Sequence, residues 1–306
     1  TDSIYVFDAT AWRVANNVEK VLGGCVSAIQ DSVGKSGNAY YICKPRSWTV
    51  ATEIQYDTYK QDCLEFGQIV HGNVNAEYVY FCYGEEWKRF YGNESISYGK
   101  LVDERDGRIY RTVRIGEQTW MAENLNYADE NSYPSMLRRN WCYDNNLDSC
   151  EKYGRLYSWS ATIDSMYWNE QGEICGYEEY PDDYHCSLSN KIQGICPDGW
   201  HLPSVDEWMA LSSSMNSNYK AIQAKGFTMW KNGTDEFGFS ALPAGGYSKD
   251  HGFVYIGEVA FFVTSSEEYR STHCMAWFVN KSESVADNRG WDKTFGRSVR
   301  CIKDEE

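Results

Sequence analysis

The sequence lacks the features that would place it among membrane proteins or common enzymes. No apolar run approaches the roughly 20 residues that a transmembrane helix needs. The cysteines form no CxxC pair, and no histidine stands at zinc-finger spacing from them. The HExxH motif of metalloproteases, the GxSxG elbow of hydrolases and a glycine-rich phosphate loop are absent too. We therefore expect a binding or structural protein and no enzyme.

Positive charge is also scarce, since 29 basic residues stand against 44 acidic ones and leave a net charge of −15. Such a field repels nucleic acids and anionic lipids, so we expect neither as a partner. Leucine is infrequent, whereas the chain holds 24 Tyr, 12 Trp and 12 Phe. This balance favours short strands and loops over helical bundles. The aromatic side chains are expected to divide between β-sheet cores and a binding surface.

Cysteine, in contrast, is plentiful. The chain has 11 well-separated cysteines, which favours disulfide bonds and an oxidising compartment. The odd number leaves at least one thiol unpaired or linked to another chain. Because no signal peptide is recognisable, we interpret the sequence as the mature form of an exported protein.

Residues 1–90 contain a repeated motif. Its copies are YVFDATAWRVA from Tyr5, YICKPRSWTVA from Tyr41 and YFCYGEEWKRF from Tyr80. The first copy has Phe7 where the other two have a cysteine five positions before the tryptophan. This regularity predicts a series of similar structural units.

Two disulfides are predicted inside the repeats, Cys25–Cys43 and Cys63–Cys82, because their spacings of 18 and 19 residues are nearly equal. Each closes a loop with turn-forming residues midway, as in a β-hairpin. Such a cross-link contributes roughly 3 kcal/mol in the chain-entropy model. Residues 1–90 are thus predicted to be stapled hairpin repeats, either a stalk or a small all-β domain packed on the rest.

The polar stretch over residues 91–104 is predicted to be a linker. Beyond it, alternating apolar residues indicate a strand around Ile109 to Ile115. Helical spacing over 156–163, and a capping box formed by Ser204 and Glu207, predict two helices. Further strands are predicted over 237–242, 253–256, 259–264, 275–279 and 298–302. Together these elements indicate an α+β domain over residues 105–306.

Five segments of this domain resemble a known family. They are DGRIYRTVRIGEQTWMAENLNY from Asp106, YGRLYSWSATID from Tyr153, CPDGWHLPSVDEW from Cys196, FSALPAGGY from Phe239 and GRSVRCIKD from Gly296. In this order they resemble the Fibrobacter succinogenes major paralogous domain, a family of secreted bacterial domains related to the C-type-lectin fold. The Cys/Trp repeats are also similar to segments that often precede this domain. The resemblance implies export and a role at the cell surface.

The relation to C-type lectins implies one disulfide and a ligand face. In those lectins a cysteine before the second helix pairs with one in the last strand, which corresponds to Cys196–Cys301 here. Their ligands bind between the second helix and the last strand, which corresponds to about residues 228–294. The residues of that segment expected to bind ligand are Trp230, Tyr247, His251, Tyr255, Tyr269, Arg270, Asn288, Arg289 and Trp291.

The remaining cysteines form two close pairs around polar loops. Cys142–Cys150 and Cys175–Cys186 are therefore predicted to be local disulfides. This leaves Cys274, which is expected to be a buried free thiol, or else a link to a partner chain.

Metal binding has one candidate. Asp144, Asn146 and Asp148 alternate as in the first half of a calcium loop, but the glycine and glutamate of an EF-hand are missing. The sugar-binding triplets of calcium-dependent C-type lectins are missing as well. We expect no cofactor, with calcium at this loop as the alternative.

Three functions remain. The first is a secreted or cell-surface adhesion module that recognises a glycan, such as plant cell-wall polysaccharide, through aromatic loops. The second is a structural or assembly protein of the bacterial envelope that binds another protein. The third is an enzyme similar to formylglycine-generating enzymes, which share the wider fold and use paired cysteines. No oligomeric state follows from the sequence.

Overall fold

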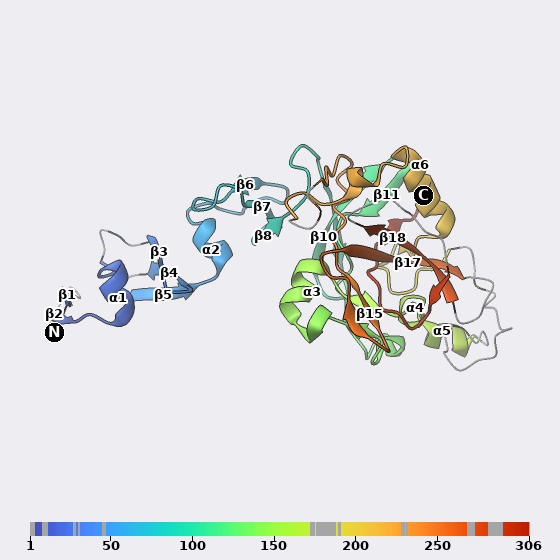
Figure 1. The fold of residues 1–306 in the computed structure, drawn as a ribbon, viewed down its shortest axis with the longest axis horizontal. Coiled ribbons are helices and arrows are strands. Elements are labelled where there is room, and N and C mark those ends of the chain that lie inside the picture. The colour runs from blue at the N-terminus through green and yellow to red at the C-terminus, as the bar shows by residue number, and fades with distance from the viewer. Residues whose placement is uncertain are drawn as a thin grey trace. The chain divides into compact units, whose positions relative to one another are not determined.

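A computed structural model describes residues 4–7, 12–26, 29, 31–44, 47–171, 175, 188, 191–227, 230, 232–267, 273–280 and 290–305. The chain forms two compact units, Thr1–Phe90 and Tyr91–Glu306 (Figure 1). Short antiparallel strands predominate in both, with a few short helices, which agrees with the α+β class. Within the described ranges, no helix is long and apolar enough to cross a membrane.

The first unit contains a small antiparallel sheet for each copy of the repeated motif. The sheets are β1 (Tyr5–Phe7) with β2 (Trp12–Val14); β3 (Val33–Ser36), β4 (Ala39–Lys44) and β5 (Ser47–Ala51); and β6 (Ile69–His71), β7 (Val79–Cys82) and β8 (Trp87–Phe90). Helix α1 (Asn17–Leu22) follows β2, and α2 (Glu53–Asp57) follows β5. Capping boxes begin both helices, built by Asn16 with Glu19 and by Thr52 with Gln55.

Disulfides join each complete sheet to the segment that leads into it. Cys25–Cys43 and Cys63–Cys82 are the pairs that the spacing favoured. Of the turn-forming residues expected midway in the first loop, Gly34 to Gly37, the first three lie in β3, and the chain reverses at Gly37, which has a φ of 62°. Glycine adopts such a left-handed conformation without steric cost.

Residues 91–104 belong to the second unit, which corrects the predicted linker. Strand β9 (Gly99–Asp103) pairs with β10 (Arg108–Ile115), and Tyr91, Ile96 and Tyr98 pack against the core. The sequence pattern concealed this strand because it lies at the edge of its sheet. Lys100 is exposed and Leu101 is buried, so only part of the strand is apolar.

Two sheets organise the second unit (Figure 1). The larger has the order β14-β20-β11-β10-β9 and includes β11 (Gln118–Met121), β14 (Trp200–His201) and β20 (Ile302–Lys303). The smaller consists of β17 (Val259–Glu267), β18 (His273–Asn280) and β19 (Gly290–Asp292). They are accompanied by a two-stranded sheet of β12 (Asn140–Trp141) and β13 (Leu156–Tyr157), and by the hairpin of β15 (Gly246–Ser248) and β16 (Gly252–Val254). Its helices are α3 (Leu147–Tyr153), α4 (Trp159–Thr162), α5 (Ser165–Glu170) and α6 (Val205–Ser214).

Helix α6 joins the two sheets through aromatic packing. It starts at the predicted capping box of Ser204 and Glu207. Its Trp208 lies 4.7 Å from the ring of Trp120 in β11, and stacks at 5.6 Å on Trp277 in β18. Rings of this size bury most of the apolar area of a small core.

Some predicted elements differ from the structure. Residues 237–242 form a turn and an irregular segment with one isolated bridge, from Ala241 to Gln223, because Gly238 and Ser240 have φ values of 71° and 52° that a regular strand does not accommodate. The predicted helix over 156–163 divides into β13 and α4. The segment 298–302 makes scattered backbone bridges and is a strand only from Ile302.

Covalent links hold the second unit together. The disulfide Cys196–Cys301 connects residues 105 positions apart and joins the segment before β14 to the residue directly before β20. Cys142–Cys150 ties α3 to the preceding turn. Cys175 is disulfide-bonded, and its predicted partner Cys186 lies outside the described residues. Cys274 is a buried free thiol.

Candidate functional site

The nine residues predicted to bind ligand fall into three groups: residues outside the described ranges, one core residue and four residues with some exposure. Tyr269, Arg270, Asn288 and Arg289 lie outside the described residues. Trp230 is a core residue, since it is 2% exposed and its Nε1 donates to the carbonyl of Glu258 at 3.1 Å. A ring enclosed in this way has no face for a ligand, which corrects that prediction. The other four, Tyr247, His251, Tyr255 and Trp291, keep some exposure.

The hairpin β15–β16 carries the first of these side chains. Tyr247 stacks on Trp141 with ring centroids 4.3 Å apart and also contacts Phe253 on the paired strand. Backbone hydrogen bonds in both directions hold Tyr247 beside Gly296. A Cβ on Gly296 would lie only 3.0 Å from the Trp141 ring, so glycine allows the close approach. His251 is exposed in the turn of this hairpin.

The outer face of β17–β18–β19 carries a second group of rings. Phe262 points into the core against Trp208, and the strand alternation turns Phe261 to the opposite face. Phe261 is nevertheless only 3% exposed, because four aromatic side chains cover it. They are Tyr255, Phe278, Trp291 and Phe295, with ring centroids 5.2–6.2 Å from that of Phe261.

Phe295 connects the two groups. Its ring edge lies 2.4 Å from the position that a Cβ on Gly246 would take, so it covers the backbone of β15. We call the connected set the aromatic surface: Trp141, Tyr247, Phe253, Tyr255, Phe278, Trp291 and Phe295 around buried Phe261. Its members come from five separate stretches of the chain.

Tyr255 is the most exposed ring of the aromatic surface. Its side chain is 53% exposed, and its backbone has a φ of 63°, a conformation uncommon for residues other than glycine. Its carbonyl accepts hydrogen bonds from the backbone amides of Glu258 and Val259, which hold this turn. Strained backbone of this kind is often found where a side chain must be presented for function.

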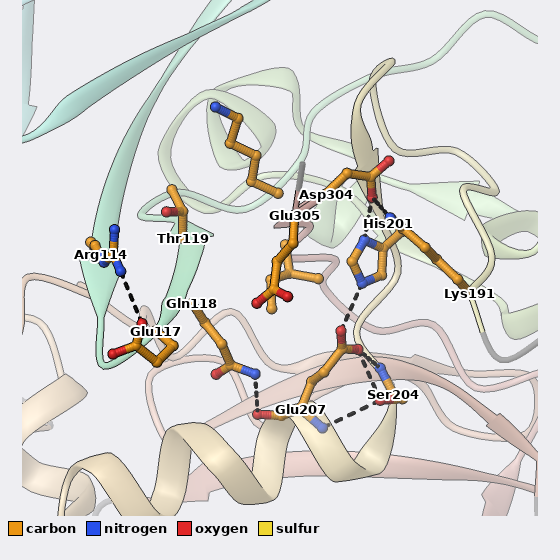
Figure 2. Close-up of a pocket in the computed structure, with 12 residues that line it drawn as sticks. Arg114, Glu117, Gln118, Thr119, Lys191, His201, Ser204, Glu207, Asp304 and Glu305 are labelled. Atoms are coloured by element: carbon orange, nitrogen blue, oxygen red, sulfur yellow. Dashed lines mark hydrogen bonds and ion pairs between the residues drawn. The ribbon is translucent and has the colours of Figure 1, made fainter.

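A polar pocket of about 740 Å³ lies elsewhere in the second unit. It is lined by residues of β10, β11, β14, α6 and the C-terminal segment, and Figure 2 shows ten of them with labels. Its charges are mixed, with Arg114, Lys191, His201 and Lys303 opposed by Glu117, Glu207, Asp304 and Glu305. Such a lining suits polar groups of both signs.

His201 lies between two carboxylates of this pocket (Figure 2). Its Nδ1 donates to Asp304 at 2.6 Å and its Nε2 donates to Glu207 at 2.8 Å. Because both ring nitrogens meet carboxylate acceptors, the favoured form is the imidazolium. Burial lowers the pKa of His201, but the hydrogen bonds and charges of Glu207 and Asp304 outweigh burial and raise the pKa overall.

The acidic partners of His201 are also bonded to other groups. Lys191 contacts Asp304 at 2.8 Å, and Glu207 accepts from the backbone amide and hydroxyl of Ser204. Burial raises the pKa values of both carboxyl groups, but hydrogen bonds and these cations lower them overall. The histidine therefore joins β14, α6 and the C-terminal segment as a structural ion pair.

The alternating calcium candidates lie in the turn before α3 and at its start. Asn146 is the N-cap of α3, and its side chain accepts a hydrogen bond from the amide of Asp148. Asp144 adopts a left-handed turn conformation and is exposed. In the described part of the chain, no group of three or more His, Cys, Asp or Glu is placed to hold a metal ion.

Comparison with protein families gives one match. The model of the Fibrobacter succinogenes major domain matches residues 113–303. The chain belongs to this family. A search of curated proteins and a search of solved structures each found no match. The matched Fibrobacter succinogenes major domain begins in β10 and ends in β20. It contains the aromatic surface and all of the polar pocket's lining except Asp304 and Glu305.

Several residues of these sites escaped the sequence reasoning. Within the Fibrobacter succinogenes major domain, the predicted Tyr247, Tyr255 and Trp291 are joined by Trp141, Phe253, Phe261, Phe278 and Phe295. The alternation of β17 distinguishes Phe261 from Phe262, but it cannot show which face is the core. Asp304 reaches His201 only through the tertiary fold.

Cys274 lies inside the same domain. Its thiol contacts the guanidinium of the fully buried Arg297 at 3.6 Å. Burial raises the pKa of this thiol, although Arg297 opposes the shift. Because Cys301 is bonded to Cys196, Cys274 and Cys301 do not form the thiol pair that formylglycine-generating enzymes use.

Proposed function

We propose that the Fibrobacter succinogenes major domain of this chain is an extracellular binding module that recognises a glycan on the aromatic surface. The observation that carries the proposal is the half-exposed Tyr255 ring, held by a left-handed backbone above a cluster of aromatic side chains. A sugar ring has an apolar face that stacks on such side chains, and tyrosine hydroxyls offer hydrogen bonds at the edge.

The disulfides support the location outside the cell. Four cross-links join described cysteines, and such bonds persist in oxidising compartments. The sequence resemblance to domains with a C-type-lectin-like scaffold supports a binding role rather than catalysis. In that scaffold the connecting segments carry recognition, and the most exposed ring of the aromatic surface, Tyr255, lies in the segment that connects β16 to β17.

Binding to polysaccharide tests the proposal. We expect the protein to be retained on insoluble cellulose or xylan, or slowed in gels that contain soluble glycans. Replacing Tyr255→Ala should weaken binding by about tenfold, because one stacking interaction contributes roughly 1 kcal/mol or more.

Tyr167→Ala is the matched control. Tyr167 is also 53% exposed but lies on α5, outside the aromatic surface. Equal losses in the two variants, or no retention on any glycan, would count against the proposal.

A second function is attachment to another protein of the bacterial envelope. It is favoured by exposed apolar side chains of the first unit, among them Tyr5, Phe7 and Trp12. A stoichiometric partner in native mass spectrometry of material from cells would support it, and a monomer throughout would oppose it.

A further inference from the structure

The second unit begins with a segment without helix or strand, residues 91–98, which we call the strap. The strap directly follows the first unit and leads into β9. The ring of Tyr91 lies 4.6 Å from that of Phe227. Ile96 covers Gly238 so closely that a Cβ added there would lie 2.8 Å from Ile96 Cγ2. Side-chain packing therefore holds the strap at two points.

Asp235 fixes the backbone of the strap between these points. Its side chain is fully buried, and its Oδ2 accepts hydrogen bonds from the amide of Asn93 at 3.0 Å and from the hydroxyl of Ser240 at 2.8 Å. Oδ1 accepts from the amide of Ser240 at 2.6 Å. One buried carboxyl group thus joins the strap to the loop over residues 235–240.

Asp235 lacks the ionic partner that another buried acid of the same unit has. Asp103 is equally buried, and its carboxylate is paired with Arg105 at 2.7 Å. The donors to Asp235 are neutral amides and a hydroxyl, and no described cation forms an ion pair with it. A buried charge without an ionic partner is costly, and the cost disappears when the group is protonated or reaches water.

Three charged or titratable side chains act on Asp235 from the segments packed around it: Tyr98 of the strap, Arg111 of β10 and Arg300 before β20. Arg111 also pairs with Glu123, and the N–H groups of Arg300 donate to the side chain of Asn124 and to backbone carbonyls. Glu94 of the strap and Glu236 of the loop are exposed. Burial outweighs the hydrogen bonds of Ser240 and Asn93 and the charge of Arg111, and raises the pKa of Asp235 to about 6.

The hydrogen-bond network can accept a proton without losing the strap. The neutral carboxyl group can donate from Oδ2 to Ser240 Oγ, whose own hydrogen then turns to the carbonyl of Gly238 at 3.5 Å. The amide of Asn93 also has the hydroxyl of Tyr98 as an acceptor at 3.3 Å. The closed strap is therefore compatible with a neutral Asp235.

We propose that the strap is a pH-dependent closure of this unit, which packs firmly in mild acid, when Asp235 is neutral, and opens more readily once Asp235 is ionised. Opening brings water to the carboxylate and so removes the cost of its burial. Because the pKa is raised in the closed form, that form binds the proton more tightly than the open form, and it loses this advantage as the pH rises through about 6. Since the strap directly follows the first unit, its opening lengthens the connection between the two units.

The size of the effect follows from the pKa values of the two forms. The closed form has a pKa of about 6, and an open, hydrated carboxyl group has the ordinary value of 3.8. Opening should therefore become about tenfold more frequent from about pH 5 to about pH 8. Most of the change falls below about pH 7, because Asp235 is ionised in both forms at higher pH.

Hydrogen exchange of the full oxidised chain tests the proposal, with each rate divided by the intrinsic rate at that pH. The amides of Asn93 and Ile96 report on the strap, since they donate to Asp235 and to the carbonyl of Asn93. The amides of β10 serve as the internal reference. We expect the tenfold change in the strap only. Asp235→Asn should abolish it, because the amide keeps an acceptor but does not titrate in this range.

Two further variants make the test specific. Ser240→Ala removes a hydrogen bond that favours the ionised form, so the midpoint of the change should move upward by up to about one pH unit. Glu236→Gln is the matched control, because it removes an exposed carboxyl group one residue away and should leave the profile unaltered. The proposal is overturned if the strap amides change no more with pH than those of β10. It is also overturned if Asp235→Asn retains the change, if Glu236→Gln loses it, or if Ser240→Ala leaves the midpoint in place.

Discussion

The ion pair at His201 leads to a prediction that can be worked out from the structure. The imidazolium joins Asp304 after β20 to Glu207 on α6. We consider His201→Gln, which keeps a polar side chain but removes the charge and one of the two donors. Each hydrogen bond to a charged group contributes about 1.5–3 kcal/mol to stability.

The loss of stability in His201→Gln should be smaller than the summed contributions of the two hydrogen bonds that His201 makes. The side chains of Asp304 and Glu207 are partly exposed, and Glu207 keeps its hydrogen bonds from Ser204. Water can therefore hydrate the released carboxylates. We expect His201→Gln to lower the free energy of unfolding by about 2–3 kcal/mol at about pH 6.

The effect should depend on pH in a defined direction. The pKa of His201 is raised in the folded state, so the native state binds this proton more tightly than the unfolded chain. The stabilisation is complete below the unfolded pKa of about 6.5 and is lost as the pH rises through the folded pKa. The difference between the two proteins should therefore shrink from about pH 6 to about pH 9.

Urea unfolding of the oxidised protein, followed by tryptophan fluorescence, measures this difference. The control is His251→Gln, at an exposed histidine in the β15–β16 turn. It should change the free energy of unfolding by less than about 0.5 kcal/mol. If the loss of unfolding free energy in His201→Gln stayed constant or grew toward alkaline pH, the ion-pair reasoning would be refuted.

Two further predictions concern the frame of the domain. Replacing both Cys196 and Cys301 by serine should lower the free energy of unfolding by up to about 4.7 kcal/mol. Replacing both Cys142 and Cys150 by serine should lower it by about 2.5 kcal/mol, because the shorter disulfide loop restrains the unfolded chain less. Thermal unfolding of both double variants measures the order, and a larger loss at the shorter loop would contradict it. Gly246→Ala should displace Phe295, whose ring lies 2.4 Å from the added Cβ, and cost about 1–3 kcal/mol. Near-ultraviolet circular dichroism should report the disturbed rings, and an unchanged spectrum and stability would show that Phe295 moves freely.

Local patterns in the sequence predicted much of the scaffold. Equal spacing identified the bonded pairs Cys25–Cys43 and Cys63–Cys82, since a hairpin of fixed length brings two positions together wherever it recurs. The capping box at Ser204 predicted the start of α6, because its hydrogen bonds involve residues only three apart. The relation to C-type lectins that the family resemblance implied supplied the pairing of Cys196 with Cys301, which no local pattern contains.

Sequence patterns gave wrong predictions where segments far apart in the chain determine the burial of a residue. The stretch from Gly99 to Asp103 was predicted to be a linker, but it pairs with β10 in the structure. Trp230 was predicted to bind ligand, but the core encloses it. Burial depends on what packs against a side chain, and that is not encoded within a few neighbouring residues.

The sequence by itself determined the three repeats, the abundance of disulfide bonds, the family and the high content of aromatic residues. These depend on composition, spacing and hydrogen bonds between near neighbours. Only the tertiary structure decided which rings form one surface and that Asp304 meets His201. Each of these depends on contacts between segments far apart in the chain, where packing selects among arrangements that the local sequence allows equally.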